Sequence, residues 1–142
     1  MSSVKVLPEH CLKLIAKRDR EPLGKAGRTM GEIYEAADKK AELDLQGEIA
    51  GYLRLHEIEY IKPDGRKKSP LPAGWPDFTF AYRGVPVGME VKTEKGALSS
   101  DQTSRHMAMR ANGWRMVIVR SIPDVQALLR AIDAEIQPRV KL

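Results

Sequence analysis

The sequence predicts an α/β domain in which helices flank a mixed β-sheet, with its elements in the order α-β-β-β-α-β-α. Three observations predict this class. Residues 29–56 have apolar side chains at three- and four-residue steps, as in an amphipathic helix. Two strand-type runs, Phe78–Tyr82 and residues 85–92, are joined by an Arg-Gly pair, which is typical of a hairpin. The apolar run 114–120 follows a further predicted helix, so we expect it to pair in parallel with the strand before that helix.

Composition restricts the class of protein further. The chain has 142 residues, of which 42% are hydrophobic and 30% charged, as in one globular domain. It has no apolar run long enough to span a membrane and no signal-peptide core at its N-terminus. One cysteine, Cys11, excludes an intrachain disulfide and a zinc site built from cysteines. We therefore expect a soluble, cytoplasmic protein, and its net charge of +5 favours a phosphate-bearing partner.

The chain is predicted to divide into a basic N-terminal arm with a short helix, residues 1–28, and a main domain, residues 29–142. Apolar residues from Leu12 to Ala16 are spaced for a helical turn, and arginines and lysines follow with proline and glycines between them. Two interpretations of this arm stay open. It is either a contact for a phosphate backbone or a solvated linker.

The first helix of the main domain begins with a predicted capping box, in which Thr29 is the N-cap and Glu32 is the third helical residue. The pattern fits one helix, or two helices joined near residues 44–47, that end around His56. A short strand is expected over residues 58–61. Residues 62–74 are basic and rich in turn-forming residues, as in an exposed loop.

The second half of the domain is predicted from local signals. Pro86 restricts the start of its strand to a sheet edge or a bulge. Ser99 or Ser100 caps a helix that runs to Asn112. Pro123 opens the last helix. The buried stripe of that helix is predicted to be Val125, Leu128, Leu129, Ile132 and Ile136.

The chemistry is expected where the two hairpin strands meet. Glu90 and Lys92 lie two residues apart on one strand and therefore on one face, with Met89 facing the other side. Asp77 begins the partner strand, so the hairpin can bring its carboxylate beside that of Glu90. Two adjacent carboxylates repel unless a cation lies between them. Mg²⁺ or Mn²⁺ suits such oxygen ligands, and a lysine beside the ion can orient or deprotonate a water for phosphodiester hydrolysis.

This ordered series resembles the PD-(D/E)xK nuclease superfamily and, within it, the VRR-NUC (virus-type replication-repair nuclease) family. The similarity covers about residues 40–130. The fold implied is restriction-endonuclease-like. The matching pieces are Glu42-xxx-Gln46-xx-Ile49-xx-Tyr52-Leu53, GWPDFTF, GMEVKTEKGALSSDQ, Gly113-Trp114 and VIVRS.

The resemblance also implies roles for individual residues. Asp77 and Glu90 would bind the metal together with the carbonyl of Val91, and Lys92 would serve the attacking water. Gln102 matches the family's helix glutamine beside the site, and its other interpretation is the capping-box partner of Ser99.

A helical acid completes the implied catalytic set, and two candidates stay open for it. Glu42 fits the spacing of the family's pattern and is the preferred one, whereas Glu48 lies on the opposite border of the same apolar stripe. The three histidines, His10, His56 and His106, have no ligand spacing and are interpreted as surface or packing residues.

The expected function is that of a Mg²⁺-dependent DNA endonuclease. The resemblance implies a homodimer acting on branched DNA, similar to a Holliday-junction resolvase, in phage or bacterial replication and repair. Two alternatives remain: a non-catalytic DNA-binding module that retains the fold, and a restriction-type endonuclease that reads a defined sequence.

Overall fold

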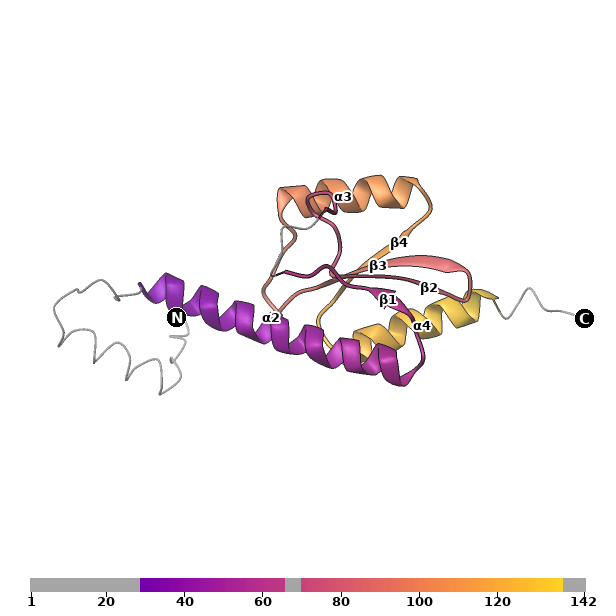
Figure 1. The fold of residues 1–142 in the computed structure, drawn as a ribbon, viewed down its shortest axis with the longest axis horizontal. Helices are drawn as coiled ribbons and strands as arrows, with labels where there is room; N and C mark the ends of the chain where they lie inside the picture. Colours follow the sequence, from indigo (N-terminus) through magenta and orange to yellow (C-terminus); the bar gives the residue numbers. More distant parts are fainter. Residues whose placement is uncertain (1–28, 66–69, 137–142) are drawn as a thin grey trace, which may run out of the picture. The chain divides into compact units, whose positions relative to one another are not determined.

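The computed structural model describes residues 29–65 and 70–136 (Figure 1). The predicted N-terminal arm, 1–28, and residues 66–69 of the basic loop lie outside the described residues. The chain divides into two units between Lys39 and Lys40, and the sheet belongs to the second unit. The elements described are α2 (Met30–Leu55), β1 (Tyr60–Ile61), β2 (Phe78–Tyr82), β3 (Val85–Val91), α3 (Ser100–Ala111), β4 (Arg115–Val119) and α4 (Ile122–Ile136).

Helix α2 begins at the predicted capping box. The backbone N–H of Glu32 donates to Thr29 Oγ1 at 3.1 Å, and the backbone N–H of Thr29 donates to Glu32 Oε2 at 2.5 Å. Each bond satisfies a donor that has no partner within the helix. The helix continues through residues 44–47 without a break, so the one-helix alternative is correct.

The sheet has four strands in the order β1-β2-β3-β4. Strand β3 pairs with β2 antiparallel and with β4 in parallel, which confirms the predicted mixed sheet and the crossover through α3. Arg83 and Gly84 connect β2 to β3, and both have positive φ angles, 50° and 83°, as in a type I′ hairpin turn. Strand β4, which pairs in parallel with β3, is one residue shorter at each end than the predicted strand 114–120.

Pro86 lies in the central strand β3, but it is at a local sheet edge, as predicted for this proline. Strand β4 begins to pair with β3 only at Val87, so β3 is locally an edge where Pro86 lies. On its other side Pro86 is paired with Ala81, one step from the hairpin's first pair, at a position where the two residues do not exchange hydrogen bonds. The missing N–H of proline therefore removes no bond from the sheet.

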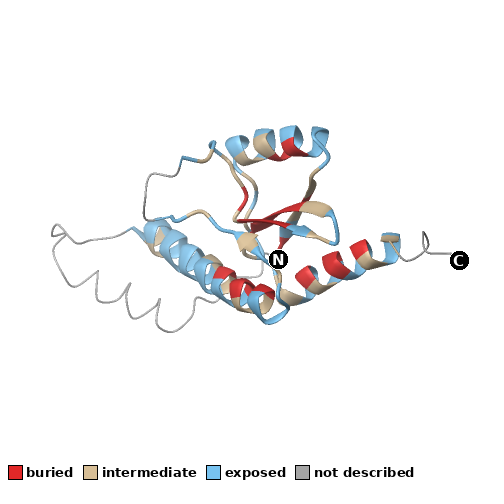
Figure 2. Ribbon diagram, turned by 45° about the vertical axis from the view of Figure 1, so that its right-hand side comes forward, coloured by how far each residue is buried: buried red, intermediate tan, exposed pale blue. Residues whose placement is uncertain are grey.

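The alternation of β3 separates a packing face from a chemical face. Met89 and Val91 face the core formed with α4 and the C-terminal part of α2, whereas Glu90 faces α3. Figure 2 shows the buried residues on the strands and on the helix sides turned toward the sheet. The core side chains are Ile49, Ala50, Leu53, Phe78, Phe80, Val87, Met89, Val91, Val119, Val125, Leu128, Leu129 and Ile132.

Helix α4 supplies most of the predicted stripe. Four of its five predicted residues are buried, and Ile136 at the end of the helix is half-buried against the same core. In the part of the chain that the structure describes, no helix is both long and apolar enough to cross a membrane.

Candidate active site

The sheet register brings Asp77 and Glu90 together. Phe78 pairs with Met89, so the residue before Phe78 lies beside the residue after Met89. The backbone N–H of Val91 donates to Asp77 Oδ2 at 2.8 Å and holds this carboxylate against the end of β3. The predicted convergence of the two acids, which are distant in sequence, is confirmed.

The loop before Asp77 is fixed against the start of α3. Gly74 has a φ of 77°, and a Cβ atom added to it would lie 2.3 Å from the backbone oxygen of Asp101. A side chain at this position would therefore collide with rigid backbone. Arg105 adds a hydrogen bond of 3.2 Å from Nε to the carbonyl of Ala73. These contacts bring the segment that precedes Asp77 next to the helix that contains Gln102.

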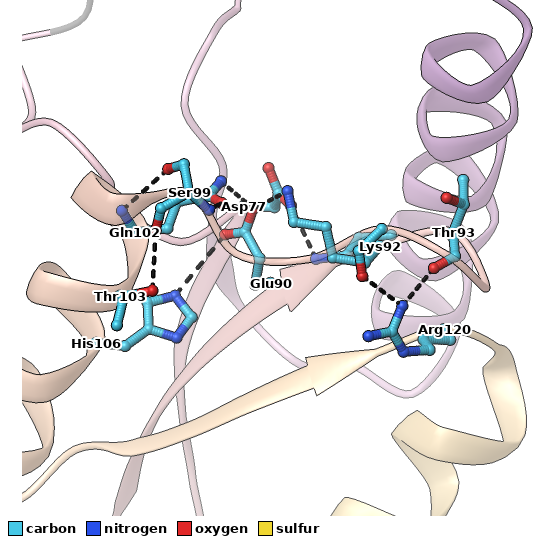
Figure 3. A network of polar contacts seen from close by, with 11 residues as sticks. Asp77, Glu90, Lys92, Thr93, Ser99, Gln102, Thr103, His106 and Arg120 are labelled. Carbon is cyan, nitrogen blue, oxygen red and sulfur yellow. Dashed lines mark hydrogen bonds and ion pairs between the residues drawn. The ribbon is translucent and has the colours of Figure 1, made fainter. Parts of the chain in front are cut away.

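Glu90 is the centre of the polar cluster in Figure 3. Its side chain is 2% exposed. Gln102 Nε2 donates to Glu90 Oε1 at 2.6 Å, and the Nζ atom of Lys92 lies 3.5 Å from the same oxygen. The other oxygen, Oε2, is buried and accepts no hydrogen bond from any residue that the structure describes. The cluster thus joins two carboxyl groups, one ammonium group and one amide.

Gln102 forms the predicted capping box with Ser99 and also lies beside Glu90. Its backbone N–H donates to Ser99 Oγ at 3.2 Å, and its Oε1 accepts from the backbone N–H of Ser99 at 2.9 Å. The nitrogen of the same carboxamide group is then directed at Glu90. The capping box fixes the amide orientation and so determines that a donor, not an acceptor, faces the carboxylate.

Burial dominates the electrostatics of the two acids. It raises the pKa of Asp77 above the ordinary value, and the hydrogen bond from Val91 opposes part of that rise. For Glu90, burial first and the charge of Asp77 second raise the pKa to about 8, against the lowering effect of Lys92. Without a metal, the two carboxyl groups therefore tend to retain a proton at neutral pH. A bound cation would remove this tendency, because its charge stabilises the carboxylates.

His106 lies in this cluster and was missed as part of the site. Its side chain is 2% exposed, and its Nε2 atom lies 3.9 Å from Glu90 Oε2. Neither ring nitrogen has a hydrogen-bond partner among the described residues, and burial lowers its pKa. His106 is buried, as expected for a packing residue, but it also lies beside Glu90. Its four-residue spacing from Gln102, one turn of α3, was the signal that both face Glu90.

The two candidate helical acids differ in exposure. Glu42 is half-buried, one turn before the buried Gln46 and on the side of α2 that includes Ile49 and Leu53. Glu48 is exposed. This difference favours Glu42 for any role near the sheet, while the contacts that define the cluster come from β3, α3 and the segment before β2.

The donor set is suited to a hard divalent cation. The described residues contain no group of three or more His, Cys, Asp or Glu side chains arranged as a metal site. Mg²⁺ ordinarily needs only one or two protein carboxylates, because water and substrate phosphates complete its shell. The adjacent carboxyls of Asp77 and Glu90, with Glu90 Oε2 unpartnered, meet that requirement.

Comparison of the chain with protein-family models, with curated proteins and with solved structures finds no match.

Proposed function

We propose that this protein is a metal-dependent deoxyribonuclease with a restriction-endonuclease-like fold of the VRR-NUC type. One observation supports the proposal above the others: Asp77, Glu90 and Lys92 meet beside Gln102 at one end of the sheet. A buried carboxyl group beside a half-buried one, with an adjacent ammonium group, is costly for stability alone. The arrangement is useful where a cation and a phosphate group must be held together.

In the proposed reaction, Asp77 and Glu90 would hold Mg²⁺ or Mn²⁺ together with the carbonyl of Val91. The ion, when bound, supplies positive charge that stabilises the phosphate in the transition state. The ammonium group of Lys92 orients the attacking water and stabilises the hydroxide that is left when this water gives a proton to solvent. The water oxygen bonds to phosphorus, the bond from phosphorus to the leaving oxygen breaks, and that oxygen takes up a proton. Gln102 keeps Glu90 in position.

DNA is the proposed substrate, and branched DNA is the first form to test. The net charge of +5 and the resemblance to VRR-NUC nucleases support this choice. A homodimer acting on both strands of a junction, in the cytoplasm of a bacterial or phage-infected cell, belongs to the same proposal.

Single-turnover cleavage of labelled four-way junction, flap and linear duplex DNA tests the proposal. Wild-type protein should cut at least one substrate in Mg²⁺ or Mn²⁺ and none in EDTA. Lys92→Ala should reduce the rate by roughly 10²-fold or more, because proton transfer and charge stabilisation are both impaired. DNA affinity measured in Ca²⁺ should stay nearly constant, since one phosphate contact among several alters binding little.

Lys95→Ala is the matched control, because it removes an equal charge from an exposed position three residues away. It should cleave like wild type. Equal losses of affinity and rate in Lys92→Ala would make this lysine a backbone anchor. If wild type binds DNA but cleaves no substrate with either metal, the proposal fails and a non-catalytic DNA-binding module is the better description.

A further inference from the structure

A tight turn directly after Lys92 packs against the lysine side chain. The turn spans residues 93–96 and is closed by a hydrogen bond of 3.1 Å from the backbone N–H of Gly96 to the carbonyl of Thr93. A Cβ atom added to Gly96 would lie 3.3 Å from both Cβ and Cδ of Lys92. The turn therefore contacts the aliphatic stem of Lys92, whose side chain is 12% exposed and extends toward Glu90.

Arg120 holds both ends of this turn. Its Nη1 atom donates to the carbonyl of Thr93 and, at 2.8 Å, to the carbonyl of Gly96 (Figure 3). The two hydrogens on one guanidinium nitrogen thus satisfy both backbone acceptors. The planar, permanently charged guanidinium makes such bonds with less loss of freedom than a lysine ammonium does.

The backbone of Arg120 is itself anchored. Its N–H donates at 2.8 Å to Asp124 Oδ2 in the first turn of α4, and the N–H of Asp124 donates at 3.3 Å to Ser121 Oγ. On the sheet side, the N–H of Lys92 donates at 3.1 Å to the carbonyl of Val119. Arg120 therefore extends from a fixed junction between β4 and α4 to the turn that packs on Lys92.

We propose that Arg120 is a positioning residue for Lys92. By holding the turn 93–96 against the lysine stem, Arg120 directs the ammonium group toward Glu90 and keeps the side chain shielded from solvent. The consequence for catalysis depends on the proposed nuclease function. The effect on Lys92 itself does not depend on it and can be measured without any substrate.

The first test measures the acetylation rate of each lysine by peptide mass spectrometry, using an N-hydroxysuccinimide ester on the full-length protein. Arg120→Ala should raise the rate at Lys92 by about threefold or more, because local opening exposes a protected group. Lysines on α2 should keep their wild-type rates. Arg130→Ala, which removes the same charge from an exposed position on α4, should leave Lys92 protected.

The second test is single-turnover cleavage. Arg120→Ala should lower the rate by about tenfold, since a misplaced catalytic group loses much of its effect, while DNA affinity in Ca²⁺ stays at the wild-type level. Arg120→Lys should recover part of the rate and part of the protection together. A residue with a purely structural role would lower stability without this joint recovery.

Unchanged acetylation of Lys92 in folded Arg120→Ala would overturn the proposal. If circular dichroism shows that Arg120→Ala does not fold, Gly96→Val is measured instead, because its side chain crowds the stem of Lys92 and loosens the contact with the turn while Arg120 is retained. Faster acetylation of Lys92 in that variant supports the positioning role, and an unchanged rate overturns it. If wild type cleaves no DNA, the nuclease proposal fails, and the acetylation results still decide the role of Arg120.

Discussion

Glu90 is a buried carboxyl group next to a second carboxyl group, and its surroundings only partly compensate for that cost. Gln102 donates a hydrogen bond to Oε1, and Lys92 forms an ion pair with the same oxygen. The other oxygen, Oε2, faces the ring of His106 without a hydrogen bond. A proton or a cation at this position would lower the free energy of the folded state. The two compete for the same carboxyl group, so pH and metal affinity should be linked there.

The raised pKa of Glu90 predicts how stability depends on pH. In the unfolded chain the carboxyl loses its proton near its ordinary value of 4.5, whereas in the folded protein it keeps the proton until about pH 8. The folded state therefore binds more protons in this window, and the free energy of unfolding should fall as the pH rises from 4.5 to 8. Urea unfolding of metal-free protein at several pH values measures the slope.

Glu90→Gln is the control for this slope, because the amide resembles the protonated acid and does not titrate. The variant should lose most of the decline seen in wild type. Saturating Mg²⁺ should also flatten the wild-type curve, since the cation takes the place of the proton. Parallel curves for wild type and Glu90→Gln would show that Glu90 does not titrate in this range.

The choice between the two candidate helical acids gives a second prediction. If half-buried Glu42 acts near the metal, Glu42→Gln should strongly reduce the cleavage rate with little change in DNA affinity. Exposed Glu48 serves as the matched control, and Glu48→Gln should cleave like wild type. The reverse pattern in a single-turnover assay would transfer the role to Glu48, and two active variants would place both acids on a solvated helix face.

Residue spacing was sufficient to predict part of the cluster. Strand alternation placed Glu90 and Lys92 on one face, and the hairpin brought Asp77 to them. His106 could have been found from its four-residue spacing to Gln102 on α3, but Arg120 could not. The contacts of Arg120 depend on how the β4–α4 junction lies against the turn after β3, and no local period predicts that geometry.

One side chain of helix α3 contributes both to the stability of that helix and to the candidate site. Gln102 closes the capping box with Ser99 and also donates to Glu90. The two functions can be separated. Ser99→Ala should cost about 1 kcal/mol of stability through the lost cap. Its cleavage rate should stay within a fewfold of wild type at a temperature where the variant is folded.

Gln102→Glu is the complementary change. Its carboxylate can still accept from the backbone of Ser99, so the cap is retained, but the donor to Glu90 is replaced by a third negative charge. We expect a large loss of cleavage with a smaller defect in α3. Chemical denaturation and single-turnover rates, measured on both variants, check this separation. The same rank order of stability and rate would mean that the cap alone accounts for the effect of Gln102.

The elements were predictable to within a residue or two where local signals mark their ends. Serine at the start of α3 and Asn-Gly after it gave the helix close to its observed bounds, Ser100–Ala111. The long first helix was ambiguous, because its polar residues 44–47 fit a junction as well as a helix. Packing of Ile49 and Leu53 against the sheet favours the continuous form.

At the scale of the whole molecule, the predicted crossover through α3 limited the possible sheet topologies, and the observed mixed sheet agrees with it. The register of β1 against β2 could not be predicted, because the loop between these strands is long. The register of β2 against β3 follows from the predicted two-residue turn at Arg83 and Gly84, and the site depends on it. A shift of one residue in the β2–β3 pairing would turn Glu90 toward the apolar core.

Because the fold brings the two carboxyl groups together, metal binding should stabilise the entire domain. A cation that binds the folded protein and not the unfolded chain contributes about 1.4 kcal/mol at ten times its dissociation constant. For a chain of this length the melting temperature should then rise by a few degrees. Calorimetric scans with Mg²⁺, with Mn²⁺ and with EDTA measure the shift without any DNA.

Asp77→Asn should remove most of this shift, because the amide can still accept the bond from Val91 but no longer provides the second negative charge. Asp38→Asn removes the same charge from an exposed position on α2 and should retain the full shift. Lys92→Ala should retain it too, since both carboxylates remain, so metal binding and catalysis separate in one variant. A wild-type shift that persists unchanged in Asp77→Asn would place the cation elsewhere on the molecule and leave the carboxyl pair without a metal.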